Sequence, residues 1–263
     1  MIFKCKFEKK NTNLNMKYKL RSATMNNERF QKPDLLLALK ANPKWKEVQQ
    51  NEENQQIIHR VFDLKLKQLT TDITEKHILG QPTAPLEIVK ICPKTNPLAY
   101  ILVPLNTIPR TKIQTSLELD KMITAEIPNP ETQPELHNLI AKHMIHTACL
   151  TTNKQSSCSN QYGRCRSNFP KEFQEETHKD QFIGHGLPEC KRRSPSRGGY
   201  TTTIKTKGKT ITVDNRWVIP YNPFLMTKYQ TFMAIGIGTR DMWTKFLRQE
   251  GLKNEKGYQK WFC

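Results

Sequence analysis

The sequence of 263 residues lacks any apolar run near the length of about 18 residues that a transmembrane helix needs, so no membrane span is predicted. Residues 1–6 also lack the apolar core of a signal peptide, and a nuclear or cytoplasmic protein is expected, not a secreted one. Hydrophobic residues make up only 36%, which predicts a modest core and long polar segments. The seven cysteines are an odd number, which disfavours a disulfide framework and favours reduced thiols or metal ligation.

Acidic residues are scarce, with 24 Asp and Glu against 42 Lys and Arg and a net charge of +18. The excess is concentrated after Cys190, where fifteen basic residues stand against four acidic ones. Nucleic acid is the partner class that such charge most readily suggests. A lysine-rich solvated surface is the common alternative.

The spacing of apolar residues predicts an α+β fold. The run at 35–39 is typical of a buried strand, with a helix as the alternative, and helical spacing over roughly 52–77 predicts an amphipathic helix that Gly80 and Pro82 end. The other predicted elements are strands at 86–91 and 99–103, helices near 116–126 and 133–146, an irregular Cys/Ser/Gly-rich segment over about 150–200, and a hairpin of 201–205 and 209–213.

The most informative run is VDNRWVIPYNP at 213–223. Its two prolines are three apart and impose an extended, turning backbone, which excludes a helix interior or a central strand. Further distinctive blocks, in chain order, are NPKW at 42–45, RVFDLKLK at 60–67, TAEIPNP at 124–130, HMIHTAC at 143–149 and CRSNFPKEF at 165–173.

Together these blocks resemble, in order, the Rep region of Helitron transposases, a nuclease of the HUH type that is also called the Helitron helicase-like domain. The resemblance implies an antiparallel Rep-type sheet flanked by helices. On this basis we expect a degenerate Rep-like domain over 31–235 and a divergent basic tail over 236–263. The Lys/Asn-rich residues 1–30 lack apolar periodicity and are expected to be disordered or poorly packed.

The resemblance also locates the family's catalytic positions. HUH nucleases hold a divalent metal between two histidines one residue apart on a strand, and a tyrosine on a helix attacks the phosphate. The positions of the histidine pair correspond to Leu98 and Tyr100, and those of the paired tyrosines to Phe246 and Glu250. Leucine cannot ligate a metal and a neutral phenol is a poor substitute, so no catalytic metal and no nuclease activity are expected.

The ATP-binding loop of a helicase is not predicted either. The only candidate is Gly208-Lys209-Thr210, but Thr203 stands where the first glycine of the loop is required. A turn glycine between two lysines is the better interpretation.

A Cys/His cluster suggests a structural zinc site. His146, Cys149, Cys158 and Cys165 supply four zinc-binding side chains from two short segments, with His143 as an alternate on the same predicted helical face. Free thiols and packed histidines are the alternative, because the spacing is not that of a standard finger. Cys190, next to three basic residues, is interpreted as a surface residue.

The basic C-terminal part is expected to bind single-stranded DNA or another nucleic acid, with cations along the phosphates and aromatic rings on the bases. The candidate nucleic-acid-binding residues are Lys191, Arg192, Arg193, Arg197, Lys205, Lys207, Lys209, Arg216, Trp217 and Tyr221. An inactive, DNA-binding Rep remnant is therefore the main hypothesis. The alternatives are a domesticated structural or regulatory module that binds RNA or protein, an active nuclease with a substituted site, and a relic with no selected role.

Overall fold

The computed structural model describes residues 35–50, 55–83, 86–91, 96–105, 116–150, 158–183, 187–206 and 208–237. The chain forms two compact units. Unit 1 comprises Met1–Ile108 with Ile237–Tyr258, and unit 2 comprises Pro109–Gly236 with Gln259–Cys263. The predicted N-terminal segment 1–30 and the predicted tail beyond residue 237 lie outside the described residues.

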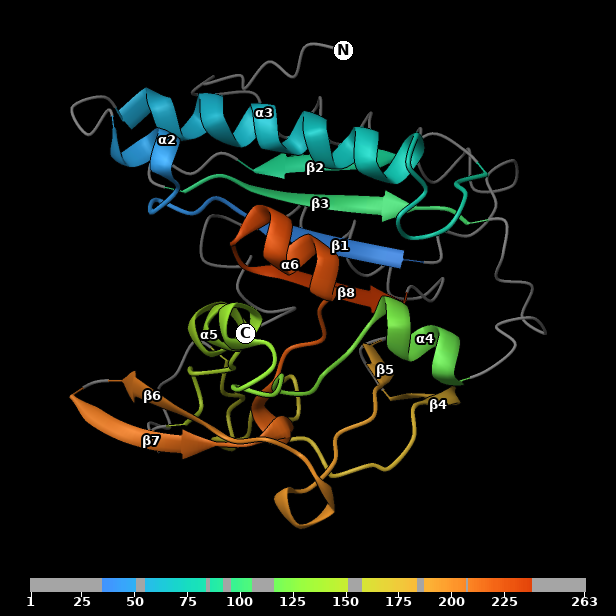
Figure 1. Cartoon of the computed structure of the whole chain (residues 1–263), viewed down its shortest axis with the longest axis vertical. Helices are drawn as coiled ribbons and strands as arrows, with labels where there is room; N and C mark the ends of the chain where they lie inside the picture. The colour runs from blue at the N-terminus through green and yellow to red at the C-terminus, as the bar shows by residue number, and fades with distance from the viewer. Residues whose placement is uncertain are drawn as a thin grey trace. The chain divides into compact units, whose positions relative to one another are not determined.

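Unit 1 contains an antiparallel arrangement in which β3 (Leu98–Val103) pairs with β1 (Leu35–Lys40) on one side and with β2 (Glu87–Ile91) on the other (Figure 1). The first five residues of β1 are buried, so both faces of this strand are covered. This burial explains why the sequence there reads as a continuous apolar run instead of an alternating one. The strand predicted at 35–39 is confirmed, as are the two strands that follow it.

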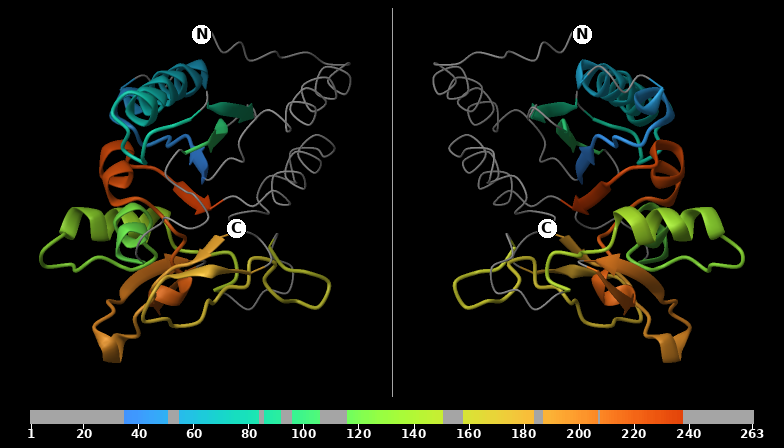
Figure 2. Two further views of the ribbon diagram at one scale, coloured as in Figure 1. Left: turned by 90° about the vertical axis from the view of Figure 1, so that its right-hand side faces the viewer. Right: turned by 90° about the vertical axis from the view of Figure 1, so that its left-hand side faces the viewer.

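Helix α3 (Gln55–Thr74) lies over one face of these strands and follows the short helix α2 (Lys46–Gln49) (Figure 2). Its fully buried apolar side chains, Phe62, Leu66, Leu69 and Ile73, recur every three or four residues, as an amphipathic helix requires. The long helix predicted over 52–77 is confirmed.

Unit 2 consists of short helices and antiparallel hairpins. Its elements are α4 (Ser116–Met122), α5 (Pro134–His143), β4 (His178–Ile183), β5 (Leu187–Glu189), η2 (Pro195–Arg197), β6 (Thr202–Thr206), β7 (Lys209–Val213), η3 (Asn215–Trp217), α6 (Pro223–Tyr229) and β8 (Met233–Ile237), whose last residue belongs to unit 1. The β6–β7 hairpin confirms the predicted one, with Gly208 at φ 74° in its turn. The β4–β5 hairpin was not predicted, because its residues fall in the segment interpreted as irregular.

Both predicted helices of unit 2 end earlier than their apolar spacing suggests. Helix α4 ends at Met122, and Thr124 pairs in antiparallel fashion with Tyr221. Helix α5 ends at His143, and Ile145 pairs with Val218. The backbone of the 213–223 run supplies hydrogen bonds that compete with the last helical turns, so the residues after each helix become extended.

The 213–223 run is the framework of unit 2. Asn215 is fully buried; its Oδ1 accepts from the Ile127 N–H at 2.7 Å, and its Nδ2 donates to the Arg193 carbonyl at 2.9 Å. The Tyr221 hydroxyl donates to the Glu126 carbonyl at 2.8 Å. Asn222 donates to the Met122 carbonyl and caps α6 by accepting from the Leu225 N–H. The motif therefore satisfies buried backbone groups from several parts of the unit.

The architecture as a whole is α+β with antiparallel strands, as predicted. Among the helices of the described residues, none combines the length and the apolar character that crossing a membrane requires.

Candidate metal centre

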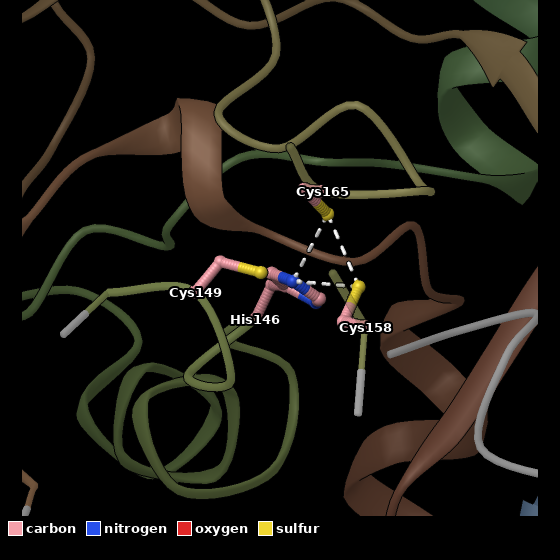
Figure 3. A group of neighbouring side chains, drawn as sticks. All are labelled: His146, Cys149, Cys158 and Cys165. Carbon is pink, nitrogen blue, oxygen red and sulfur yellow. Dashed lines mark hydrogen bonds between the residues drawn. The ribbon is translucent and has the colours of Figure 1, made fainter. Parts of the chain in front are cut away.

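Four side chains of unit 2 point toward one another: His146, Cys149, Cys158 and Cys165 (Figure 3). Their potential ligand atoms, one from each residue, all lie within 4.8 Å of one another. Within the part of the chain that the structure describes, this is the only such group of His, Cys, Asp or Glu side chains. It is the same quartet that the sequence suggests.

The distances fit a tetrahedral zinc ion. His146 Nε2 lies 3.4 Å from Cys165 Sγ and 3.6 Å from Cys158 Sγ, and the two sulfur atoms are 3.2 Å apart. In a tetrahedral site, ordinary Zn–S and Zn–N bond lengths place two sulfurs about 3.8 Å apart and a sulfur about 3.6 Å from a nitrogen. The sulfur pair would therefore separate by about half an ångström around the ion.

Local structure positions three of these ligands. His146 follows α5 in the extended segment, where its N–H donates to the Trp217 carbonyl at 2.9 Å. Cys158 and Cys165 stand at the two ends of a small hairpin, closed by a bridge between Ser159 and Cys165. The ligands thus come from one segment after α5 and from one hairpin, which a metal ion would cross-link.

The imidazole of His146 lies nearly parallel to two neighbouring aromatic rings. It stacks on Phe169, with ring centroids 4.3 Å apart and planes at 12°, and lies nearly parallel to Trp217 at 6.5 Å. With the side chain only 2% exposed, this stacking fixes the orientation of the ring. Phe169 and Trp217 belong to the blocks 165–173 and 213–223, so three of the sequence blocks meet at this centre.

The electrostatics of the two hydrogen-bonded thiols favour metal ligation. The hydrogen bond with Cys158 lowers the pKa of Cys165, and the bond to His146 lowers it further. The same Cys158–Cys165 bond, together with burial, raises the pKa of Cys158. A divalent cation bound by both sulfur atoms would have to displace the proton that the raised pKa of Cys158 retains.

Two expectations about neighbouring residues are wrong. His143 and His146 do not share a helical face, because α5 ends at His143 and only His146 reaches the cluster. Cys190 is not a surface residue: it is 1% exposed, and burial raises the pKa of its thiol to about 12. A protonated, buried thiol packs as a small apolar side chain.

The structure separates the candidate nucleic-acid-binding residues into internal and external ones. Arg192 is 3% exposed and donates to the carbonyls of Asn215 and Val218, and burial lowers its pKa to about 10. The side chain of Arg193 donates three hydrogen bonds to the carboxylate of Glu126, at 2.9, 3.1 and 2.6 Å. Tyr221 is 2% exposed. Arg192 and Tyr221 are thus buried inside unit 2, whereas Arg193 pairs with Glu126 and keeps 36% of its side chain exposed.

The remaining candidates are more accessible. Lys191, Arg216 and Trp217 are half-buried, and Arg216 pairs with Asp214 at 2.8 Å. Lys207 lies outside the described residues. The fully exposed basic candidates are Arg197, Lys205 and Lys209.

The positions that correspond to the family's catalytic residues are described only in part. Leu98 and Tyr100 lie on β3, in the middle of the three strands, where Tyr100 is 1% exposed and Leu98 is half-buried. Phe246 and Glu250 lie outside the described residues.

Residues 5–94 match the model of the Helitron helicase-like domain at the N-terminus. The match includes the blocks at 42–45 and 60–67, together with β1, α3 and β2. No curated protein matches the chain. Over residues 5–94 the chain is therefore similar to Helitron helicase-like domains, which confirms the resemblance for the blocks at 42–45 and 60–67; the four later blocks lie outside the match.

Proposed function

We propose that this protein binds single-stranded DNA through unit 2 without cutting it, and that a zinc ion at His146, Cys149, Cys158 and Cys165 stabilises that unit. The observation that carries the zinc part of the proposal is the quartet of ligand atoms within 4.8 Å of one another. A site with four protein ligands leaves no open position for a catalytic water, so its zinc would be structural. The ion would supply a cross-link between the segment after α5 and the 158–165 hairpin.

The absence of nuclease chemistry is supported by side chains at the corresponding positions. The sequence contains no His-x-His pair. Leu98 offers no ligand atom, and the ring of Tyr100 is packed among the apolar residues of the β3 region. A phosphate and its metal ion would need to reach this strand, and neither side chain provides the charge or the ligand to hold them.

The DNA-binding part of the proposal is supported by basic side chains that are exposed and not buried against other groups of unit 2. Arg197, Lys205 and Lys209 are exposed on η2 and on the β6–β7 hairpin. Arg197 has only a long contact of 3.9 Å with Glu175, a weak pair between exposed side chains. Such cations are free to follow a phosphate backbone, which needs dense positive charge and little geometry.

The test uses the full chain, purified in reducing buffer. Metal analysis by mass spectrometry should find close to one zinc per chain, and fluorescence anisotropy with a labelled oligonucleotide should give affinity that falls steeply with salt. Incubation with single-stranded DNA and Mg²⁺ or Mn²⁺ should yield no covalent protein–DNA adduct. Metal-free folded protein would refute the zinc site, and a flat salt response or no binding at low salt would refute DNA binding.

Competition decides between this proposal and a domesticated RNA- or protein-binding role. Unlabelled single-stranded DNA, RNA of the same sequence and an acidic polypeptide are added to the complex. Single-stranded DNA should displace the probe at the lowest concentration. Displacement at lower concentrations of RNA or of the acidic polypeptide would contradict the proposed ligand.

A further inference from the structure

The hairpin that carries two of the four cysteines exposes a feature outside the sequence-predicted binding surface. At its tip, Tyr162 is 76% exposed, the highest value among the exposed large hydrophobic side chains of the described residues. Arg164 and Arg166 are exposed beside it. The ring of Tyr162 therefore offers an uncovered aromatic face on which another flat ring can stack.

Hydrogen bonds around the turn hold the tip of this hairpin in one backbone conformation. The Asn160 Oδ1 accepts from the N–H groups of Tyr162 and Arg164, both at 2.9 Å. Backbone bonds close the hairpin on either side, from the Asn160 N–H to the Arg164 carbonyl at 2.8 Å and from the Arg166 N–H to the Cys158 carbonyl at 2.9 Å. Gly163, at φ 75°, makes the turn that these bonds require. The ring and the two guanidinium groups are therefore presented on a fixed backbone, at low entropic cost of binding.

The charge around the tip has one sign. From Cys158 to Lys171 the sequence contains three basic residues and no acidic one. Across the described part of the chain, no carboxylate is paired with Arg164 or Arg166, in contrast to Arg193 and Arg216. The two guanidinium groups at the tip are available to an anionic ligand.

We propose that Tyr162, Arg164 and Arg166 form a contact site for single-stranded nucleic acid, in which the ring of Tyr162 stacks on an unpaired base and the two arginines bind the flanking phosphates. A single strand is favoured over a duplex because an aromatic face can stack only on a base that has left its neighbours. This inference rests on the proposed function and adds residues that lie outside the basic segment after Cys190. It also gives the metal a role, since Cys158 and Cys165 anchor the hairpin at its base.

Three variants of the full chain separate the contribution of base stacking by Tyr162 from that of phosphate binding by the two arginines. Tyr162→Ala should weaken binding to a labelled single strand by roughly 5- to 150-fold, the range expected for one lost base stack, while Tyr162→Phe should bind like the parent protein. The double variant R164Q/R166Q should lower the slope of log affinity against log salt by about 1.4, because each phosphate contact on a single strand contributes about 0.7. Tyr162→Ala should leave that slope unchanged, since a stack releases no counterion.

Matched controls remove a similar side chain elsewhere. Phe224→Ala removes a ring that is 53% exposed on α6, and Lys67→Gln removes an exposed charge on α3. Both should bind like the parent protein. Zinc content and circular dichroism, measured on every variant, show that the hairpin and its anchor are intact. As a second measurement, photo-cross-linking to an oligonucleotide with 5-iododeoxyuridine should label Tyr162, as identified by peptide mass spectrometry.

The outcomes are distinguishable. If the parent protein binds and the Tyr162 and arginine variants bind equally well, the contact site is refuted while the proposed function stands. Cross-linking confined to residues after Cys190 would refute the site in the same way. If the parent protein binds no single strand at low salt, both proposals fail.

Discussion

Replacing Asn215 by alanine tests whether the VDNRWVIPYNP run is architectural. The side chain is fully buried and connects two parts of unit 2 that are distant in sequence, through the Ile127 N–H and the Arg193 carbonyl. Alanine leaves both of these backbone groups without a partner in a site that water does not reach. The Asn215 carbonyl, which accepts from Arg192, is part of the backbone and stays in place.

The expected loss is large relative to the stability of a small domain. Each buried polar group that loses its partner costs about 1–3 kcal/mol, so two of them predict a decrease of about 2–6 kcal/mol in the free energy of unfolding. Domains of this size are stable by roughly 5–15 kcal/mol. Asn215→Asp should be no better than alanine, because a carboxylate keeps the acceptor for Ile127 but faces the Arg193 carbonyl without a donor.

Urea unfolding of the zinc-loaded full chain, followed by circular dichroism, measures the change. Hydrogen exchange at the Ile127 amide reports the broken bond locally. Asn138→Ala is the matched control, because Asn138 is exposed on α5 and alanine is a better helix former. If Asn215→Ala unfolds at the same urea concentration as the parent but loses DNA binding, the run is a ligand contact and its architectural role is refuted.

The remaining predictions concern the metal centre and the turn before β6. Cys158→Ser should reduce bound zinc well below one per chain, whereas Cys190→Ala should leave it unchanged, and metal analysis of both proteins decides this. Zinc affinity should fall as pH falls, because Cys158 must lose its proton to bind the ion and its hydrogen bond with Cys165 raises its pKa. Chelator competition at a series of pH values measures how steeply the zinc affinity changes. Gly199→Ala should destabilise unit 2 far more than Gly208→Ala in thermal unfolding. A Cβ at Gly199 would lie 2.1 Å from the Arg193 carbonyl oxygen, whereas at Gly208 only the positive φ is unfavourable, at about 1–2 kcal/mol.

Elements with strong periodicity could be predicted from the sequence. Helix α3 and strands β1 and β3 carry dense apolar patterns, and their own packing determines them. The ends of α4 and α5 could not be predicted, because the competing hydrogen bonds come from residues about 70 to 100 positions later in the chain. The β4–β5 hairpin was missed because its sequence has no regular alternation.

The metal-binding quartet could be predicted because ligand chemistry restricts the candidates to cysteine and histidine, and few of these occur together. Of the two histidines, His146 is the one whose ring nitrogen lies with the three sulfur atoms, and tertiary contacts explain this. His146 reaches the cluster because its backbone pairs with Trp217 and its ring stacks on Phe169. Neither partner is adjacent to it in the sequence.

The position of the binding surface depends on which charges the fold already uses. Counting basic and aromatic residues selects Arg192, Arg193 and Tyr221, but all three serve carbonyls or a carboxylate inside unit 2. A guanidinium group buried against two carbonyls is part of the fold, and charge reversal there would report unfolding instead of lost binding. When such residues are set aside, the exposed basic side chains of unit 2 that remain include those on η2, on the β6–β7 hairpin and at the 158–165 hairpin. At the last of these, a large exposed ring stands beside Arg164 and Arg166, both adjacent to the candidate metal ligand Cys165, so the proposed contact site combines stacking and charge there.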